Sequence, residues 1–157
     1  MLQPIPGSID LLTALERKLG RGRRPLIIGI DGRSGAGKST LASWLAWQIG
    51  MPAVHLDLYI ERESDALGWR YDDLARVIDA RLTLRRPLIV EGVCLCEPLA
   101  ALGRNLDYWV WMENLGGREH GPEERTGDYD YITELYPEAN ADFTLTWQEK
   151  EPTVGFV

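Results

Sequence analysis

The segment from Gly32 to Ser39 has the residue types and the spacing of a phosphate-binding loop. It matches the pattern G-x-x-x-x-G-K-[ST] at every position and reads Gly32-Arg33-Ser34-Gly35-Ala36-Gly37-Lys38-Ser39. Glycines allow backbone N–H groups to turn toward a phosphate, and the N-terminus of a following helix attracts the same anion. The alternative interpretation is a glycine-rich turn with an incidental lysine.

These residues predict a site for ATP and Mg²⁺. We expect Lys38 to bridge the β and γ phosphates, Ser39 to place its hydroxyl on Mg²⁺ and Thr40 to contact the α-phosphate region. Arg33 adds a positive charge beside the phosphates, at a motif position that accepts any residue. A GTPase switch would also need a guanine-reading N-K-x-D segment, which the sequence lacks.

Two carboxylates stand where predicted strands end. Phosphoryl transfer needs such groups because Mg²⁺ must be held and an acceptor hydroxyl must be aligned or deprotonated. Asp57 follows one apolar run and Glu91 ends another, and ligands of open α/β sheets gather outside the carboxyl ends of the strands. We predict that Asp57 acts on the acceptor and that both carboxylates can support the metal or substrate. A helix cap or a solvated turn residue is the alternative for each, and His55 is expected to be a packed strand residue.

An alternation of strands and helices must position these groups. Predicted strands cover residues 25–30, 53–56, 87–91, 106–112 and 143–147, and predicted helices cover residues 8–19, 39–49, 72–82 and 97–102. Such alternation is typical of a mainly parallel sheet with right-handed crossovers. The sequence therefore predicts an α/β fold with three layers (α/β/α) and a five-stranded sheet, as one domain over residues 1–157, a length usual for one domain.

Three segments together resemble the uridine kinase and phosphoribulokinase group of P-loop kinases. They are Ile28 to Thr40, His55 to Tyr59 and Ile89 to Val93. The resemblance implies the P-loop NTPase fold, ATP and Mg²⁺ as cofactors, and transfer of a phosphoryl group to a hydroxyl of a nucleoside or other small metabolite. It also implies that Asp57, on the first acidic position of the group's L-D-D-F-Y segment, assists the acceptor hydroxyl.

The chain departs from that group around the expected acceptor. Leu58 takes the second acidic position, and the segment from Tyr59 to Pro87 is shorter than in nucleoside kinases. The aromatic side chains of Tyr59, Trp69 and Tyr71 are the candidate substrate contacts. Packing under a loop is an equal alternative for Trp69 and Tyr71.

Residues 113–126 occupy the place of a lid that closes over the phosphates in small-molecule kinases. The segment contains Arg118 and Arg125, which we predict to stabilise the transferring group, between glycines that could serve as hinges. Relatives carry more arginines here. A working kinase is the favoured interpretation, and a noncatalytic or slowly hydrolysing nucleotide-binding module is the alternative.

Composition limits the partners. The net charge of −7 argues against nonspecific nucleic-acid binding, and no apolar run approaches the length that spans a bilayer. No export signal is evident at the N-terminus, so we expect a cytoplasmic monomer or homodimer with no membrane or nucleic-acid partner. Cys94 and Cys96 lack companion ligands at metal-site spacing and are expected to be reduced structural thiols.

Overall fold

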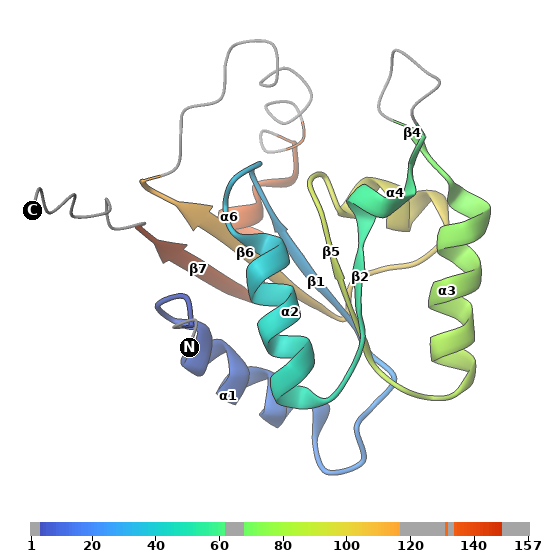
Figure 1. Ribbon diagram of the computed structural model, residues 1–157, viewed down its shortest axis with the longest axis horizontal. Helices are drawn as coiled ribbons and strands as arrows, with labels where there is room; N and C mark the ends of the chain where they lie inside the picture. Colours follow the sequence, from blue (N-terminus) through green and yellow to red (C-terminus); the bar gives the residue numbers. More distant parts are fainter. Residues whose placement is uncertain (1–3, 62–67, 117–130, 132–133, 149–157) are drawn as a thin grey trace, which may run out of the picture.

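The computed structural model describes residues 4–61, 68–116, 131 and 134–148 of the chain (Figure 1). Its centre is a five-stranded sheet in the order β2-β5-β1-β6-β7, and every pairing in it is parallel. The strands are β1 (Ile27–Gly32), β2 (Ala53–His55), β5 (Leu88–Glu91), β6 (Tyr108–Asn114) and β7 (Phe143–Trp147). The predicted five-stranded parallel sheet is therefore confirmed.

Helices cover both faces of this sheet. Successive side chains of a strand point to opposite faces, so each strand can pack against both helix layers. Ile28 and Ile30 of β1 pack in one buried cluster with helices α1 and α2, whereas Ile27 packs in a second cluster with α3 and α4. The predicted three-layer α/β/α arrangement is thus confirmed. The helices are α1 (Ser8–Leu19), α2 (Lys38–Ile49), α3 (Tyr71–Thr83), α4 (Cys96–Ala101) and the short α6 (Pro137–Asn140). Within the described ranges, none of them combines the length and the apolar character that membrane crossing requires.

Three local features differ from the sequence prediction. Residues Leu56–Tyr59 form a 3-10 helix, η1, so Asp57 lies beyond the end of β2. A two-stranded antiparallel ladder, β3 (Ile60–Glu61) with β4 (Gly68–Trp69), was not predicted. Strand β6 continues through Asn114, so the first two residues of the predicted lid belong to the sheet. They stay in the sheet because β7 pairs with them and the Leu115 N–H donates to the Trp147 carbonyl at 2.8 Å.

Gly32 ends β1 in close contact with β6. Its φ is +150°, and a Cβ built on it would lie 2.2 Å from the backbone oxygen of Met112. A side chain at this position would therefore force two adjacent strands apart, directly beneath the predicted phosphate loop.

We expect Gly32→Ala to destabilise the protein by about 3 kcal/mol or more, because the displaced contact is backbone rather than a flexible side chain. Thermal unfolding should show a melting temperature lower by roughly 6–12 °C. Gly22→Ala is the matched control, since nothing lies within 4 Å of a Cβ there. Equal melting temperatures for the two variants would contradict the close approach.

Candidate active site

The predicted phosphate loop lies between the end of β1 and the start of α2. Gly35 and Gly37 adopt φ values of +74° and +90°, which turn the backbone back on itself. The Lys38 side chain crosses this turn, and its Nζ donates to the backbone oxygen of Arg33 at 2.8 Å. Only 8% of Lys38 is exposed, whereas Arg33 is exposed at the rim. The Lys38 ammonium is thus held across the open side of the loop.

The last strand of the sheet supports the loop from below. Trp147 in β7 donates its indole Nε1–H to the backbone oxygen of Ala36 at 2.8 Å. A Cβ on Gly37 would lie 3.2 Å from side-chain atoms of Ile5, Met112 and Trp147. The loop therefore rests on packed side chains, and its curvature is fixed by residues distant in the sequence.

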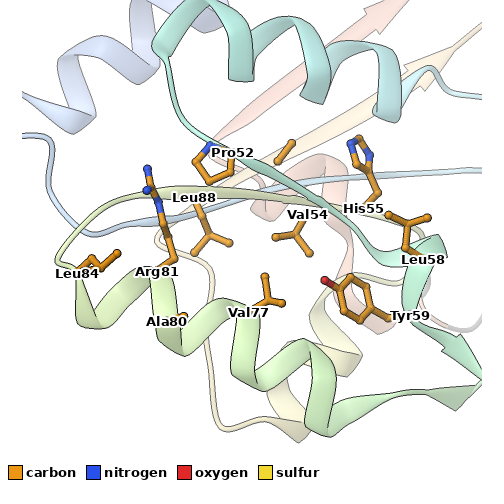
Figure 2. A pocket seen from close by; sticks show the side chains of 11 residues that line it. Pro52, Val54, His55, Leu58, Tyr59, Val77, Ala80, Arg81, Leu84 and Leu88 are labelled. Atoms are coloured by element: carbon orange, nitrogen blue, oxygen red, sulfur yellow. The ribbon is translucent and has the colours of Figure 1, made fainter.

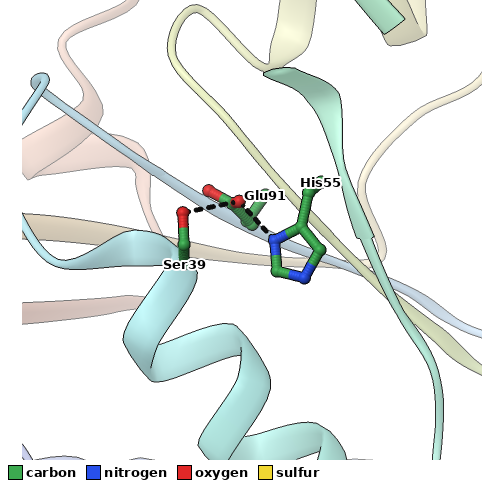
Figure 3. A network of polar contacts seen from close by, with 3 residues as sticks. All are labelled: Ser39, His55 and Glu91. Carbon is green, nitrogen blue, oxygen red and sulfur yellow. Dashed lines mark hydrogen bonds and ion pairs between the residues drawn. The ribbon is translucent and has the colours of Figure 1, made fainter. Parts of the chain in front are cut away.

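Ser39, Glu91 and His55 form a polar cluster at the carboxyl ends of β2 and β5 (Figure 3). Glu91 is only 2% exposed, and its Oε1 accepts a hydrogen bond from Ser39 Oγ at 2.9 Å. His55 Nδ1 lies 2.6 Å from the same oxygen and carries the proton, because a carboxylate only accepts. His55 and Glu91 are aligned in the parallel register of β2 and β5.

This cluster suits a hard cation. Mg²⁺ prefers oxygen ligands and is bound in nucleotide sites through one or two protein oxygens together with phosphates. Ser39, in the first turn of α2, and Glu91, at the end of β5, supply such oxygens beside the loop. Within the described residues, no group of three or more His, Cys, Asp or Glu side chains forms a ready metal site. The oxygens of Ser39 and Glu91 are of the kind that would hold Mg²⁺ jointly with nucleotide phosphates.

Asp31 forms a second buried polar cluster, which was not predicted. It is completely buried at the end of β1, and its Oδ1 accepts the N–H of Gly32 at 2.8 Å. The Tyr131 hydroxyl donates to Oδ2 and accepts the N–H of Cys96 at 3.1 Å. Burial raises the pKa of Asp31 to about 6, against the lowering effects of these hydrogen bonds, of the Leu95 amide and of Lys38. A carboxylate that ends an apolar strand was the available signal, as it was for Glu91.

The raised pKa of Asp31 predicts a pH-dependent gain of stability on substitution. The folded protein holds this proton more tightly than the unfolded chain, so the charged form opposes folding at a pH above about 6. We expect Asp31→Asn to raise the free energy of unfolding at pH 7.5 by on the order of 2 kcal/mol. The gain should shrink as pH falls below 6 and vanish near pH 3.8, the ordinary pKa of the group.

Denaturant unfolding at several pH values measures this gain. Asp107→Asn is the control, because Asp107 also accepts a β1 amide, that of Ile27 at 2.8 Å, but is exposed. Equal gains for the two variants, or a gain for Asp31→Asn that does not depend on pH, would contradict the burial argument.

The predicted acceptor residues lie around η1. Asp57 is exposed, and Tyr59 is half-buried with the Arg70 guanidinium 5.8 Å from its ring centre. Tyr71 is 39% exposed at the start of α3. Trp69 is only 3% exposed and packs in the buried cluster beneath α3. It is therefore a packing residue, and its prediction as a substrate contact is wrong.

Other predicted groups have mixed outcomes. Arg118 and Arg125 lie outside the described residues, as does most of the predicted lid. Cys94 is buried and Cys96 is half-buried, and both are reduced thiols, as predicted.

A mostly apolar groove runs beside β2, between this edge strand and α3 (Figure 2). Its volume is about 300 Å³, and His55 and Tyr59 supply polar atoms at the end next to η1. His55 is therefore shared between the groove and the Glu91 cluster. The other lining residues are Pro52, Ala53, Val54, Leu58, Val77, Ala80, Arg81, Leu84 and Leu88.

Comparison with known proteins identifies the fold. No protein-family model matches the chain, and no curated protein matches its sequence. Among solved structures, the chain is similar to a "Possible Uridine Kinase" from Bacillus stearothermophilus, with a TM-score of 0.55 and 18% identity over 87% of this chain and 98% of that one. The chain has the P-loop NTPase fold.

Two further P-loop structures show weaker similarity. Shikimate kinase from Bacteroides thetaiotaomicron has a TM-score of 0.46 and 15% identity, over 82% of this chain and 90% of that chain. A gluconokinase from Sinorhizobium meliloti 1021 has a TM-score of 0.42 and 24% identity, over 83% and 86%. The similarity to the Bacillus stearothermophilus structure, at 18% identity, shows the fold alone, and the chemistry has to follow from the residues of the site.

Proposed function

We propose that this P-loop protein is an ATP-dependent small-molecule kinase that transfers the γ-phosphoryl group to a hydroxyl of a nucleoside or another small metabolite. The observation that carries the proposal is the ammonium of Lys38, held across a glycine-rich turn beside the paired oxygens of Ser39 and Glu91. Positive charge, inward backbone amides and metal-ligand oxygens are the parts that phosphoryl transfer requires.

In this proposal the loop binds the triphosphate. Lys38 exchanges its hydrogen bond to the Arg33 carbonyl for phosphate oxygens, and the amides at the start of α2 bind the same group. Arg33 stands exposed at the rim and adds charge. These groups are in place before the reaction, so little reorganisation accompanies the charge that develops in the transition state.

Ser39 and Glu91 hold the metal in the proposed site. Mg²⁺ bound there neutralises charge on the phosphates. His55 donates to Glu91 and keeps this carboxylate turned toward Ser39. The protein thus orients its metal ligands through the aligned ends of β2 and β5.

Asp57 is the proposed acceptor residue. From η1 its exposed carboxylate aligns the acceptor hydroxyl and takes its proton as the oxygen attacks the γ-phosphorus. In this proposal Tyr59 and Tyr71 contact the acceptor, and the charges of Arg118 and Arg125 stabilise the transferring group. The leaving group is ADP, whose β-phosphate stays with Lys38.

Release of ADP in the presence of ATP and Mg²⁺ tests the function, with nucleosides, sugars and other small alcohols offered as acceptors. Turnover stimulated by one acceptor class, with a phosphorylated product detected by mass spectrometry, supports the kinase. Tight ATP binding with no stimulated turnover on any acceptor instead favours a nucleotide-binding module. No ATP binding at all contradicts both.

A further inference from the structure

The proposed transfer makes no use of the most deeply buried charged group at the end of β1. Asp31 has no exposed surface, although an isolated buried carboxylate is costly. It lies directly before the phosphate loop and receives donors from three separate segments: the loop itself at Gly32, the turn after β5 at Leu95, and Tyr131. A buried charge with this set of partners calls for an explanation beyond packing.

The hydrogen bond to Gly32 fixes where the loop begins. Because the Gly32 amide donates to Asp31 at 2.8 Å, it is engaged by the protein and does not join the amides that face the phosphates. The backbone of Gly32 also lies too close to Met112 for any side chain. The loop entry is therefore held by the Asp31 carboxylate on one side and by β6 on the other.

Tyr131 completes the arrangement from a distant part of the chain. Its hydroxyl donates to Asp31 and accepts from the N–H of Cys96, the first residue of α4. The turn that leads to α4 follows Glu91, the proposed metal ligand. The Tyr131 hydroxyl thus connects the entry of the phosphate loop with the turn between β5 and α4, which follows the proposed metal ligand Glu91.

We propose that Tyr131 is a positioning residue for the phosphate loop: its hydroxyl holds the Asp31 carboxylate, which fixes the first amide of the loop and the turn that follows Glu91. The inference rests on the proposed nucleotide site. Tyr131 itself touches neither nucleotide nor acceptor in this account. Its effect on binding passes through Asp31 and Gly32.

The charged and titratable groups around Asp31 determine how pH should affect its hydrogen bond with Tyr131. Lys38 of α2 and the Tyr131 hydroxyl both favour the charged carboxylate. Burial raises the pKa of the Cys96 thiol and, together with Asp31, that of Tyr131, so both stay protonated near pH 6. Glu91 on the neighbouring strand is engaged by Ser39 and His55. Asp31 is therefore the group of this cluster that titrates near pH 6.

Tyr131→Phe in the full chain tests the role, because it removes one oxygen and keeps the ring. In the nucleotide-free wild type, we expect the amide chemical shift of Gly32 to report ionisation of Asp31, with an inflection near pH 6. We expect the inflection to move upward by about 1 pH unit in the variant. Hydrogen exchange of the loop amides 33–38 should become about tenfold faster, and ATP·Mg²⁺ affinity at pH 7.5 should fall about tenfold.

Tyr108→Phe is the matched control, since Tyr108 is also buried but lies at the opposite end of β6, aligned with Ile28. Loop exchange in Tyr131→Phe equal to that of the control overturns the positioning role, and so does acceleration spread evenly over β1, β5 and β6. If the wild type binds no ATP, the proposed function fails. Loop exchange in the nucleotide-free protein then still decides the role of Tyr131.

Discussion

Replacing Lys38 by alanine is expected to weaken ATP·Mg²⁺ binding by at least about 100-fold, because a charge-assisted contact to phosphate is lost inside a partly desolvated loop. About 3 kcal/mol corresponds to a loss of this size. In the nucleotide-free protein the Lys38 ammonium makes a hydrogen bond to the Arg33 carbonyl, which has no charge. The variant should still fold, although it loses the charge of Lys38 that favours the buried Asp31 carboxylate.

Calorimetric titration with a nonhydrolysable ATP analogue and Mg²⁺ measures the loss, and circular dichroism checks the fold. Lys18→Ala is the control, because Lys18 lies on α1, away from the loop. Its ammonium is 5.9 Å from the centre of the Tyr108 ring. Unchanged affinity in a folded Lys38→Ala protein would remove the basis of the nucleotide site.

Replacing Asp57 by asparagine is expected to lower kcat by roughly 1,000-fold, within the range that a general base contributes. The KM for ATP should change little, because the loop and Lys38 bind the triphosphate independently of η1. The exposed position of Asp57 allows the isosteric change without loss of stability. Such a split between kcat and KM would place Asp57 on the acceptor side of the reaction.

Steady-state kinetics with the acceptor found by the ADP assay give both constants. Asp72→Asn is the control, because Asp72 is an exposed carboxylate in the first turn of α3. A kcat within a few-fold of the wild type for Asp57→Asn would assign the acceptor proton to another group. Asp57 would then be a solvated turn residue, the alternative considered from its sequence position.

The sheet and the loop could be predicted because their signals are local. Strand β1 is buried on both faces, so it appears in the sequence as a continuous apolar run that the glycines of the loop interrupt. The loop pattern then fixes the start of α2 to within a residue. By contrast, β3 and β4 contain two residues each and are too short to show a period.

The polar contacts of the site could not be predicted, because they join residues distant in the sequence. His55 and Glu91 are 36 residues apart, and Tyr131 and Asp31 are 100 apart. The order of strands decides these neighbours: β5 enters between β1 and β2, which aligns His55 with Glu91. The burial of Trp69 could not be predicted either, because it depends on how the whole layer of residues beneath α3 packs.

The hydrogen bond from Trp147 to Ala36 has a consequence for how the protein acquires its site during synthesis. The phosphate loop is translated before the indole that supports it, which is 111 residues further along the chain. A growing polypeptide that has not yet released β7 from the ribosome lacks this support and the packing of Trp147 against Gly37. In the proposed function, therefore, ATP can stabilise the protein only after β7 has joined the sheet and Trp147 supports the loop.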